Sequence, residues 1–462
     1  MPAATIAERL AGFAHRLRLD DVPAAIVEKA KLHILDTLGC AAAAADSRFA
    51  RASLAALRRL DGGSGSVAIG QAGTLGLRDV TMFNAGIGHM LDFDDTHTTT
   101  LTHVSVAALP AALALGARAG ASGRELLAAY LIAVETGCRV GLGAGDAAFL
   151  HRGVHPTGAV NMFGTALAAA RLMGLDAAKM AHAQGLALSF AAGSMEWQRD
   201  GAEAKRLHPG NAAAAGLAAA SYAAAGVTGP RLPYEGRAGL YRLFLGDDAA
   251  IDMGAVTGKL GTRWAFRDVS IKPFPLVHHV HGVIDCALRL VHEEGIGADA
   301  IDRATALIAE PQIAILCEPA EARRNPANAY QAIFSLYHTV AVVLARGRMT
   351  LAETDARLID DPAVAALRPR IDYAVDRDSL YPRSYSGGLR VRLKDGRTLQ
   401  RYAAHHPGAV ERPLTTDRVI DKFRDNAGRL YGGDRVGALL DAVMALDAEA
   451  TPASVAALLG AP

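Results

Sequence analysis

The chain has 462 residues, of which 51% are hydrophobic and 21% charged, and its formal net charge is +1. A chain of this length and composition can bury a sizeable core, which excludes a disordered protein and indicates two domains or one large domain with a smaller companion. The near-zero net charge gives no electrostatic reason to expect nucleic acid or an anionic membrane as a partner. Four widely separated cysteines form no CxxC pair, which indicates a reducing compartment and argues against an iron–sulfur cluster or a structural zinc.

The first 60 residues predict helices. Apolar residues at helical spacing, with charged residues between them, make residues 6–17 an amphipathic helix rather than a signal peptide. No stretch reaches the ~18 to 20 apolar residues of a membrane span. The nearest candidate, residues 104–117, is too short and contains Pro110. We therefore expect a soluble, cytoplasmic protein without a membrane partner.

The stretch HMLDFDDTHTTTLTHVS, residues 89–105, gathers histidines, aspartates and threonines more densely than any other part of the chain. Apolar residues upstream recur at helical spacing, which predicts a helix that carries His89, Asp92 and Thr96 on one line. An acid beside an imidazole can fix its tautomer and raise its basicity, as a proton-transfer site requires. The alternative is helix-end chemistry, because Asp and Thr clusters often cap helices and make turns.

The rest of the chain predicts a helical domain interrupted by a smaller mixed one. Residues 105–225 are rich in Ala, Leu and Gly, which predicts a tightly packed helical bundle. Short strands are predicted at 304–308 and 371–375, and a hairpin at 388–402. From about Thr415 the pattern returns to helix. The predicted fold class is mainly α, a large all-helical domain with an inserted smaller α+β domain, with the boundaries 1–266, 267–404 and 405–462.

Three further segments place cationic or titratable side chains in apolar or small-residue surroundings. The residues concerned are His155 in GVHPTG, Lys205, Arg206 and His208 in EAKRLHPGNAA, and Lys272 in SIKPFP. The first two segments precede predicted helices, the second of which Asn211 could cap, and a helix N-terminus favours an anion. Together they indicate a pocket for a substrate with more than one carboxylate. The alternative is that HP pairs only mark turns and that the lysines are surface residues.

The sequence contains little that indicates a metal site or a nucleotide-binding site. The run HHVH supplies His278, His279 and His281, but helical spacing would spread them over different faces. No HExxH, GxSxG, GxGxxG after a strand, or complete Walker A pattern is present. We therefore expect no bound metal, and the sequence argues against NTP hydrolysis, zinc proteolysis and serine esterase chemistry.

Five motifs, in this order, resemble the MmgE/PrpD family over nearly the full chain: LDFDDTH…THVS, GVHPTG, KRLHPGNAA, IKPFP and DGR…HHPG…DKFR. That family includes 2-methylcitrate dehydratase, cis-aconitate decarboxylase and iminodisuccinate epimerase. The resemblance implies a large helical domain with a smaller α+β lid domain, a homodimer, and chemistry that needs neither a metal nor an organic cofactor. The small-molecule partner that it implies is a polycarboxylate.

Matching motif by motif, the resemblance implies a pocket that contains Asp92, Thr96, His103, His155, Lys205, His208 and Lys272. We assign catalysis to His103, Asp92, His155 and Lys205, and substrate binding to Thr96, Lys272, His208 and Arg206. In this hypothesis His103, oriented by an acid such as Asp92, transfers protons opposite His155. The expected function is a lyase acting on a small di- or tricarboxylate, first a 2-methylcitrate-dehydratase-like hydro-lyase. The alternatives are an iminodisuccinate-type epimerase, a cis-aconitate-type decarboxylase, and a non-enzymatic carboxylate-binding protein.

Overall fold

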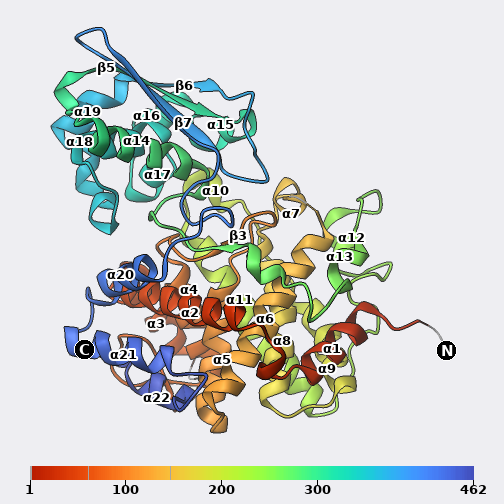
Figure 1. Ribbon diagram of the computed structural model, residues 1–462. Helices are drawn as coiled ribbons and strands as arrows, with labels where there is room; N and C mark the ends of the chain where they lie inside the picture. Colours follow the sequence, from red (N-terminus) through yellow and green to blue (C-terminus); the bar gives the residue numbers. More distant parts are fainter. Residues whose placement is uncertain (1–2, 61, 146) are drawn as a thin grey trace. The chain divides into compact units, whose positions relative to one another are not determined.

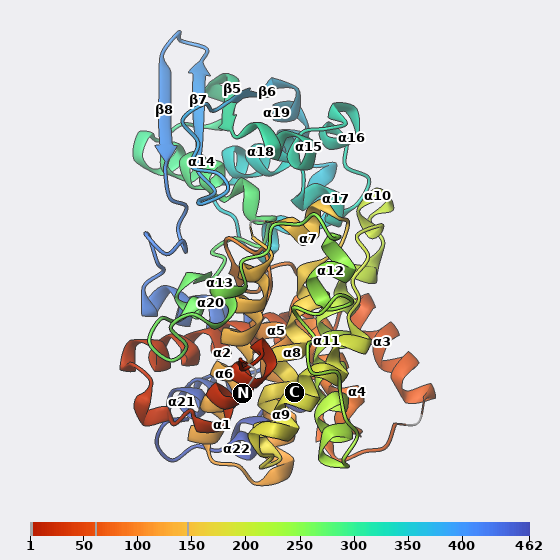
Figure 2. The same cartoon turned by 90° about the vertical axis from the view of Figure 1, so that its right-hand side faces the viewer.

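The computed structural model describes residues 3–60, 62–145 and 147–462, and the chain divides into two compact units. Unit 1 consists of Met1–Ile271 and Thr415–Pro462, and unit 2 of Lys272–Leu414. Unit 1 is helical apart from short strand pairs, whereas unit 2 combines a sheet with helices (Figures 1 and 2). The predicted class, mainly α with an inserted α+β unit, is confirmed.

The helices of unit 1 come from both ends of the chain. The N-terminal part contributes α1 (Ile6–Arg16), α2 (Ala24–Ala44), α3 (Arg48–Arg59), α4 (Leu77–His89), α5 (Ser105–Ala119), α6 (Gly123–Gly143), α7 (Ala148–His151), α8 (Pro156–Leu172), α9 (Ala177–Ala187), α10 (Trp197–Asp200), α11 (Leu207–Ala224), α12 (Leu240–Leu245) and α13 (Met253–Thr257). The C-terminal part contributes α20 (Thr416–Ala427), α21 (Gly433–Met444) and α22 (Pro452–Ala457). Its short strands are β1 (Ser66–Val67), β2 (Thr74–Leu75), β3 (Thr96–His97) and β4 (Val269–Ser270).

Small residues let the central helices of unit 1 approach closely, as their excess in the sequence predicts. Helix α8 packs against α5, α6 and α11. A Cβ atom on Gly164 would lie 2.2 Å from the carbonyl oxygen of Ala133, and one on Gly216 would lie 2.6 Å from that of Met162. Both distances are shorter than van der Waals contact, so only glycine fits at these helix crossings.

Helix α6 is the one element that is long and apolar enough to span a membrane by length and composition, among the residues that the structure describes. The expectation that no stretch reaches this length overlooked it. In the folded protein, 94% of the residues in its most apolar stretch are buried. Two of its charged residues, Glu135 and Arg139, pair with each other inside the unit at 2.5 Å. This is the packing of a core helix.

Unit 2 is built on a four-stranded sheet with the order β6-β5-β7-β8. Its strands are β5 (Ile301–Ile308), β6 (Ile371–Val375), β7 (Gly387–Leu393) and β8 (Thr398–Ala403). Strand β5 runs parallel to β6 and antiparallel to β7, which forms a hairpin with β8. The two predicted strands and the predicted hairpin are therefore confirmed.

Helices of unit 2 cover its sheet with a second apolar core. Helices α14 (His281–Glu294) and α18 (Leu336–Arg346) pack against each other and against the strands. Apolar side chains of both helices join those of the strands in one buried cluster. The remaining helices are short, and they are α15 (Glu310–Leu316), α16 (Ala320–Arg324), α17 (Ala329–Ile333) and α19 (Pro362–Leu367).

The unit boundaries lie a few residues beyond the positions taken from the sequence, 266/267 and 404/405. Residues 267–271 belong to unit 1 because β4 pairs with β3 of that unit, with Thr96 opposite Ser270. Residues 405–414 belong to unit 2, where Arg412 pairs with Asp285 of α14 at 2.7 Å. Each boundary therefore follows a specific contact that hydrophobic periodicity does not reveal.

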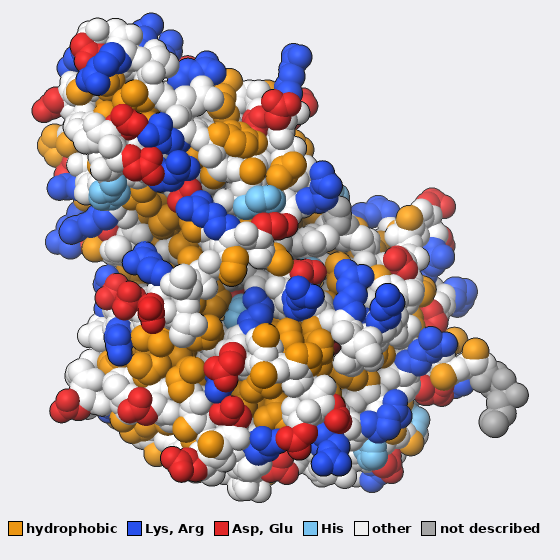
Figure 3. Space-filling model, in the orientation of Figure 1, with side chains coloured by type: hydrophobic (Ala, Val, Ile, Leu, Met, Phe, Trp, Pro, Cys, Tyr) orange, Lys and Arg blue, Asp and Glu red, His pale blue; other side chains and the backbone are white. Residues whose placement is uncertain are grey.

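The face of the molecule in Figure 3 carries acidic and basic side chains interspersed with apolar ones. This distribution agrees with the net charge of +1. A mixed surface of this kind gives no strong field that would attract a polyanion.

Candidate active site

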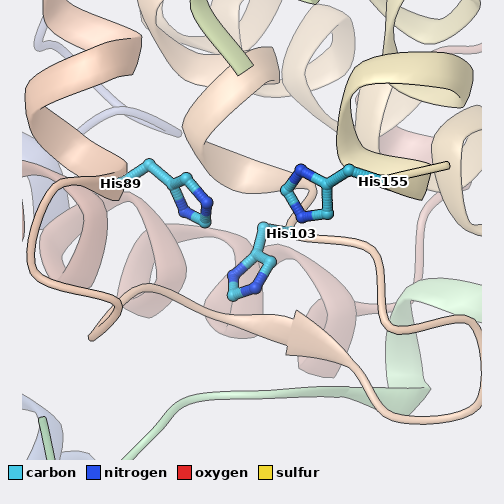
Figure 4. Close-up of side chains that lie close together, drawn as sticks. All are labelled: His89, His103 and His155. Atoms are coloured by element: carbon cyan, nitrogen blue, oxygen red, sulfur yellow. The ribbon is translucent and has the colours of Figure 1, made fainter. Parts of the chain in front are cut away.

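Three buried histidines of unit 1 come together although they are far apart in the sequence. His89, His103 and His155 each have a ring nitrogen within 4.8 Å of one on the other two. His89 is the last residue of α4, His103 lies between β3 and α5, and His155 immediately precedes α8. Their imidazoles face one another (Figure 4). The structure thus brings together two predicted site residues, His103 and His155, and adds His89, which was not among them.

The chain reaches this cluster through a turn that the helical spacing of the sequence does not reveal. Helix α4 ends at His89, so the predicted helical line through Asp92 and Thr96 is wrong. Asp92 has a φ angle of +51°, a left-handed conformation that is uncommon for residues other than glycine and is most accessible to Asn and Asp. Met90 caps the helix, and the chain then turns back into β3. This reversal of the chain direction brings the carboxylate of Asp94 back to His89 at the end of α4.

Asp94 binds two of the three imidazoles. Its carboxylate oxygens lie 3.0 Å from Nδ1 of His89 and 2.8 Å from Nδ1 of His103. A carboxylate only accepts hydrogen bonds, so each imidazole presents its Nδ1–H to Asp94 and leaves Nε2 for chemistry. The orienting acid is therefore Asp94 and not, as predicted, Asp92, whose Oδ1 lies 4.0 Å from Nε2 of His103.

The pair of histidines keeps Asp94 ionised. Burial by itself raises the pKa of a carboxyl group. At Asp94 the attraction to a protonated His103 or His89 and the hydrogen bonds of these rings outweigh burial, and they hold its pKa well below the ordinary value. Burial lowers the pKa of His89 to about 4, so this imidazole is neutral at pH 7.

Asp92 joins the cluster to the predicted lysine. The Nζ atom of Lys205 lies 2.9 Å from Oδ2 of Asp92 and 5.5 Å from the centroid of the Trp197 ring. Both charged residues are buried, Lys205 with 8% of its surface exposed. A buried ammonium group next to the histidines can pair with a substrate carboxylate.

His155 and His208, both predicted, contact each other. Their Nδ1 atoms are 3.0 Å apart, so one ring donates and the other accepts. Burial, with a smaller effect from Lys205, lowers the pKa of His208 to about 4. The same two effects hold the pKa of His155 well below its ordinary value. Both rings are therefore neutral at pH 7 and can accept a proton.

Helix α11 begins earlier than expected. It starts at Leu207, which places Asn211 inside the helix and rules out the predicted cap. Lys205 and Arg206 do precede the helix, as predicted, whereas His208 lies in its first turn. Arg206 donates to the carbonyl of Met90 at 3.3 Å, so one of its contacts fastens α11 to the end of α4.

A second carboxylate, Asp95, anchors the segment that carries the site. It accepts hydrogen bonds from Nδ1 of His33 at 2.5 Å and from the backbone and side chain of Ser105. The hydroxyl of Ser105 also lies 2.6 Å from that of Tyr130. These contacts fix residues 95–105 against α2 and α6.

The backbone of His103 is held by α8. Its N–H donates to the hydroxyl of Thr157 at 3.0 Å, and its carbonyl accepts from the amide of Asn161 at 2.7 Å. The side chain of Thr96, a predicted binding residue, is buried with its hydroxyl 3.3 Å from Nδ1 of His103. Both the backbone and the side chain of His103 are therefore held in place by neighbouring residues.

Lys272, the remaining predicted residue, is the first residue of unit 2 and is buried. Burial holds the pKa of His278, in the same unit, well below its ordinary value, and the charges of His406, His281 and Lys272 add smaller effects in the same direction. Its assignment to the substrate pocket stays a prediction.

Comparison with known proteins gives matches along nearly the whole chain. Residues 8–251 match the MmgE/PrpD N-terminal domain, and residues 274–448 match the MmgE/PrpD C-terminal domain. The cis-aconitate decarboxylase of Homo sapiens is 27% identical over 457 residues, which cover 96% of this chain and 92% of that protein. A cis-aconitate decarboxylase of Aspergillus terreus is 25% identical over 466 residues, with 96% and 93% covered. The 2-methylcitrate dehydratase of Cupriavidus necator is 30% identical over 183 residues, 37% of this chain and 36% of that protein.

Proposed function

Because this chain belongs to the MmgE/PrpD family, we propose that it is a lyase that acts on a small tricarboxylate by proton transfer at a carbon next to a carboxylate. The observation that carries the proposal is the pair of imidazoles held by Asp94, with the neutral His155 facing them. Such a set supplies a base and an acid around one point, as carbon–oxygen bond cleavage requires. Lys205 supplies a positive charge for a carboxylate.

Our first candidate reaction is dehydration, as in a 2-methylcitrate-dehydratase-like hydro-lyase. His155 is neutral, so it takes the proton from the carbon atom next to the carboxylate. The electron pair of that C–H bond forms the double bond, and the hydroxyl group on the neighbouring carbon leaves. His103 gives this hydroxyl a proton, and water is released. The sequence alone left open which of the two histidines is the acid and which is the base.

Asp94 and Asp92 suit His103 for the acid role. Their carboxylate oxygens lie 2.8 and 4.0 Å from its two ring nitrogens. Both ring nitrogens of His103 therefore face a carboxylate oxygen. A protonated ring would keep Nδ1–H on Asp94 and direct Nε2–H to the leaving group.

The second candidate is decarboxylation, and the comparisons favour it. Both cis-aconitate decarboxylases match along 96% of this chain, whereas the dehydratase match covers 37%. In this reaction the carbon–carbon bond to one carboxylate breaks, carbon dioxide leaves, and the electron pair remains on carbon. His103 then supplies the proton to that carbon, and no base is needed.

Cytoplasmic location and a homodimeric state belong to the same proposal. The support for the location is that all four cysteines are free and buried, as is usual in a reducing compartment. Sedimentation equilibrium of the purified chain tests the dimer, and a monomer at micromolar concentration would contradict it.

One substrate screen separates the candidates. The full-length chain is incubated with 2-methylcitrate, citrate, cis-aconitate or iminodisuccinate and followed by NMR in D₂O, without added metal and with a chelator present. A new alkene from a hydroxy acid identifies the dehydratase, and release of carbon dioxide with an unsaturated dicarboxylate identifies the decarboxylase. Inversion and deuterium exchange of iminodisuccinate would identify the epimerase. Saturable binding of these acids without any conversion would overturn the proposal in favour of a binding protein.

A further inference from the structure

We infer that His89, His103 and His155 form a binding site for a divalent transition-metal ion such as Zn²⁺, and that occupation of this site inhibits the enzyme. The inhibitory part rests on the proposed function, because it requires these imidazoles to carry the proton transfer. The binding part does not depend on the proposed function.

The nitrogen atoms of the three imidazoles lie close to the positions that tetrahedral coordination of one metal ion requires. Their ring nitrogens lie within 4.8 Å of one another, and the rings face a common space (Figure 4). In a tetrahedral zinc site with Zn–N bonds of 2.0–2.1 Å the nitrogen atoms are ~3.3 Å apart. Binding therefore draws the rings together by at most roughly 1.5 Å, a movement that rotation of the side chains can supply.

The hydrogen bonds of the histidines match those of metal ligands. Asp94 accepts a hydrogen bond from Nδ1 of His89, and its other contact is with Nδ1 of His103 at 2.8 Å. A carboxylate on the far nitrogen of a ligating histidine is the usual arrangement at zinc sites, because it fixes the tautomer and orients the ring. The Nε2 atom of His89 is buried and has no hydrogen-bond partner among the described residues, so a metal would satisfy it.

The charges around the cluster also favour a cation. The carboxylates of Asp92 and Asp94 lie within 4.8 Å of a ring nitrogen of His103, and Lys205 pairs with Asp92. Two carboxylates and one ammonium leave an excess of negative charge among these groups. Imidazole ligands select Zn²⁺, Co²⁺ or Ni²⁺ over Mg²⁺ and Ca²⁺, which prefer oxygen.

A bound metal would occupy the lone pairs that the proposed reaction uses. His155 could no longer accept a proton, and His103 could no longer carry one on Nε2. Turnover should therefore fall in proportion to occupancy.

Binding is tested with Co²⁺ alone, added to the full-length chain after dialysis against a chelator. We expect the visible absorption of tetrahedral Co²⁺ to saturate at one ion per chain and to disappear when Zn²⁺ is added. His89→Gln removes one ligand and should weaken binding by at least about tenfold. His151→Gln is the matched control, because His151 is exposed at the end of α7. Circular dichroism checks that both variants are folded. No such absorption, or equal affinity in both variants, would overturn the site.

Inhibition is tested in the same preparation with the substrate found in the NMR screen. We expect Zn²⁺ to abolish turnover with the midpoint that displaces Co²⁺, and a chelator to restore it. Binding at the cluster with unchanged turnover would overturn the inhibitory role and the assignment of proton transfer to these residues. Loss of turnover on chelation, restored by Zn²⁺, would instead make the metal a cofactor and overturn both inhibition and the metal-independent reaction.

Discussion

Asp94 joins two imidazoles that come from different elements, α4 and the segment after β3. Asp94→Asn keeps the shape of the side chain but replaces one accepting oxygen by an N–H₂ group, which opposes the Nδ1–H of a histidine. At least one ring must then change tautomer, so we expect turnover to fall by ~100-fold or more, as misplaced histidine tautomers do in other enzymes. Steady-state kinetics measure it, with the exposed Asp46→Asn as control. Turnover within a few-fold of the parent would remove Asp94 from the mechanism.

His103 has the most direct role in the proposed reaction. His103→Asn leaves a polar group that can still contact Asp94 but carries no titratable nitrogen. We expect turnover to fall by at least ~100-fold, the low end of what a positioned acid or base contributes. The melting temperature should change little, because the backbone bonds to Thr157 and Asn161 remain. Nearly unchanged turnover in this variant, compared with His151→Asn, would transfer the role to His155 or His89.

The sequence motifs could predict that His103, Asp92, His155, Lys205 and His208 lie together, because each stands in a motif of the family. The roles within the cluster could not be predicted in this way. They depend on the left-handed turn at Asp92, after which Asp94 contacts His103 at 2.8 Å whereas Asp92 lies closer to Lys205 than to His103. A helical extrapolation from α4 continues past His89, where the helix has already ended, and so misplaces both carboxylates.

At the level of elements, the C-terminal helix α20 supports the turn before the site. Lys422 donates from Nζ to the carbonyl of Phe93 at 2.7 Å and lies 2.6 Å from Oδ1 of Asp36 on α2. Its ammonium group also lies 3.7 Å from the centre of the Phe93 ring. One side chain therefore connects α20, α2 and the segment that carries Asp92 and Asp94.

We expect Lys422→Met to lower the free energy of unfolding by about 3 kcal/mol, the low end of the range for breaking a buried ion pair. The low end applies because burial raises the pKa of Asp36 to about 7, so this carboxyl group takes up a proton when its partner is lost. Urea unfolding measures the change.

Arg424→Met is the matched control for Lys422→Met, since Arg424 is exposed on the same helix and should cost less than about 0.5 kcal/mol. Combining Lys422→Met with Asp36→Leu should recover part of the loss. Equal effects of the Lys422 and Arg424 variants would show that the buried pair does not support the fold.

The strands and the hairpin of unit 2 could be predicted because period-two alternation and turn residues are local signals. The start of α11 could not be predicted from such signals. Pro209 resembles a boundary, yet it is the third residue of the helix, where the N–H group lacks an intrahelical partner in any case. The residue at which a helix begins therefore depends on cap geometry, which the amino-acid sequence alone does not specify.

For the whole molecule, the change from helical to mixed periodicity at the predicted boundary 266/267 indicated the insertion. It did not show which contacts fix its limits, because the β3–β4 pair and the ion pair of Arg412 join residues far apart in the chain. The packing of α20 against α2 likewise joins the two ends of the chain. These contacts between residues far apart in the chain position the site. They cannot be predicted from any local pattern in the sequence.

The stability of the whole chain should depend on pH through its buried histidines. Eight histidines among the described residues have pKa values that burial, the largest cause in each case, lowers: His33, His89, His97, His155, His208, His278, His338 and His406. Both units contain such residues. In the unfolded chain each histidine takes up a proton near pH 6.5, whereas the folded chain resists protonation until about pH 4 or below.

Between these pH values the unfolded state binds more protons, so the free energy of unfolding falls as the pH is lowered from 7 toward 4. Each such histidine contributes up to about 1.4 kcal/mol per pH unit. Asp36 and Glu135, whose pKa values burial raises, act in the opposite direction but are fewer.

Urea unfolding at pH 7 and pH 5 should therefore show a large loss of stability at the lower pH. His97→Asn, which removes one buried imidazole, should reduce the slope, and His151→Asn should leave it unchanged. Equal stability at the two pH values would contradict the proposal that these buried rings are neutral.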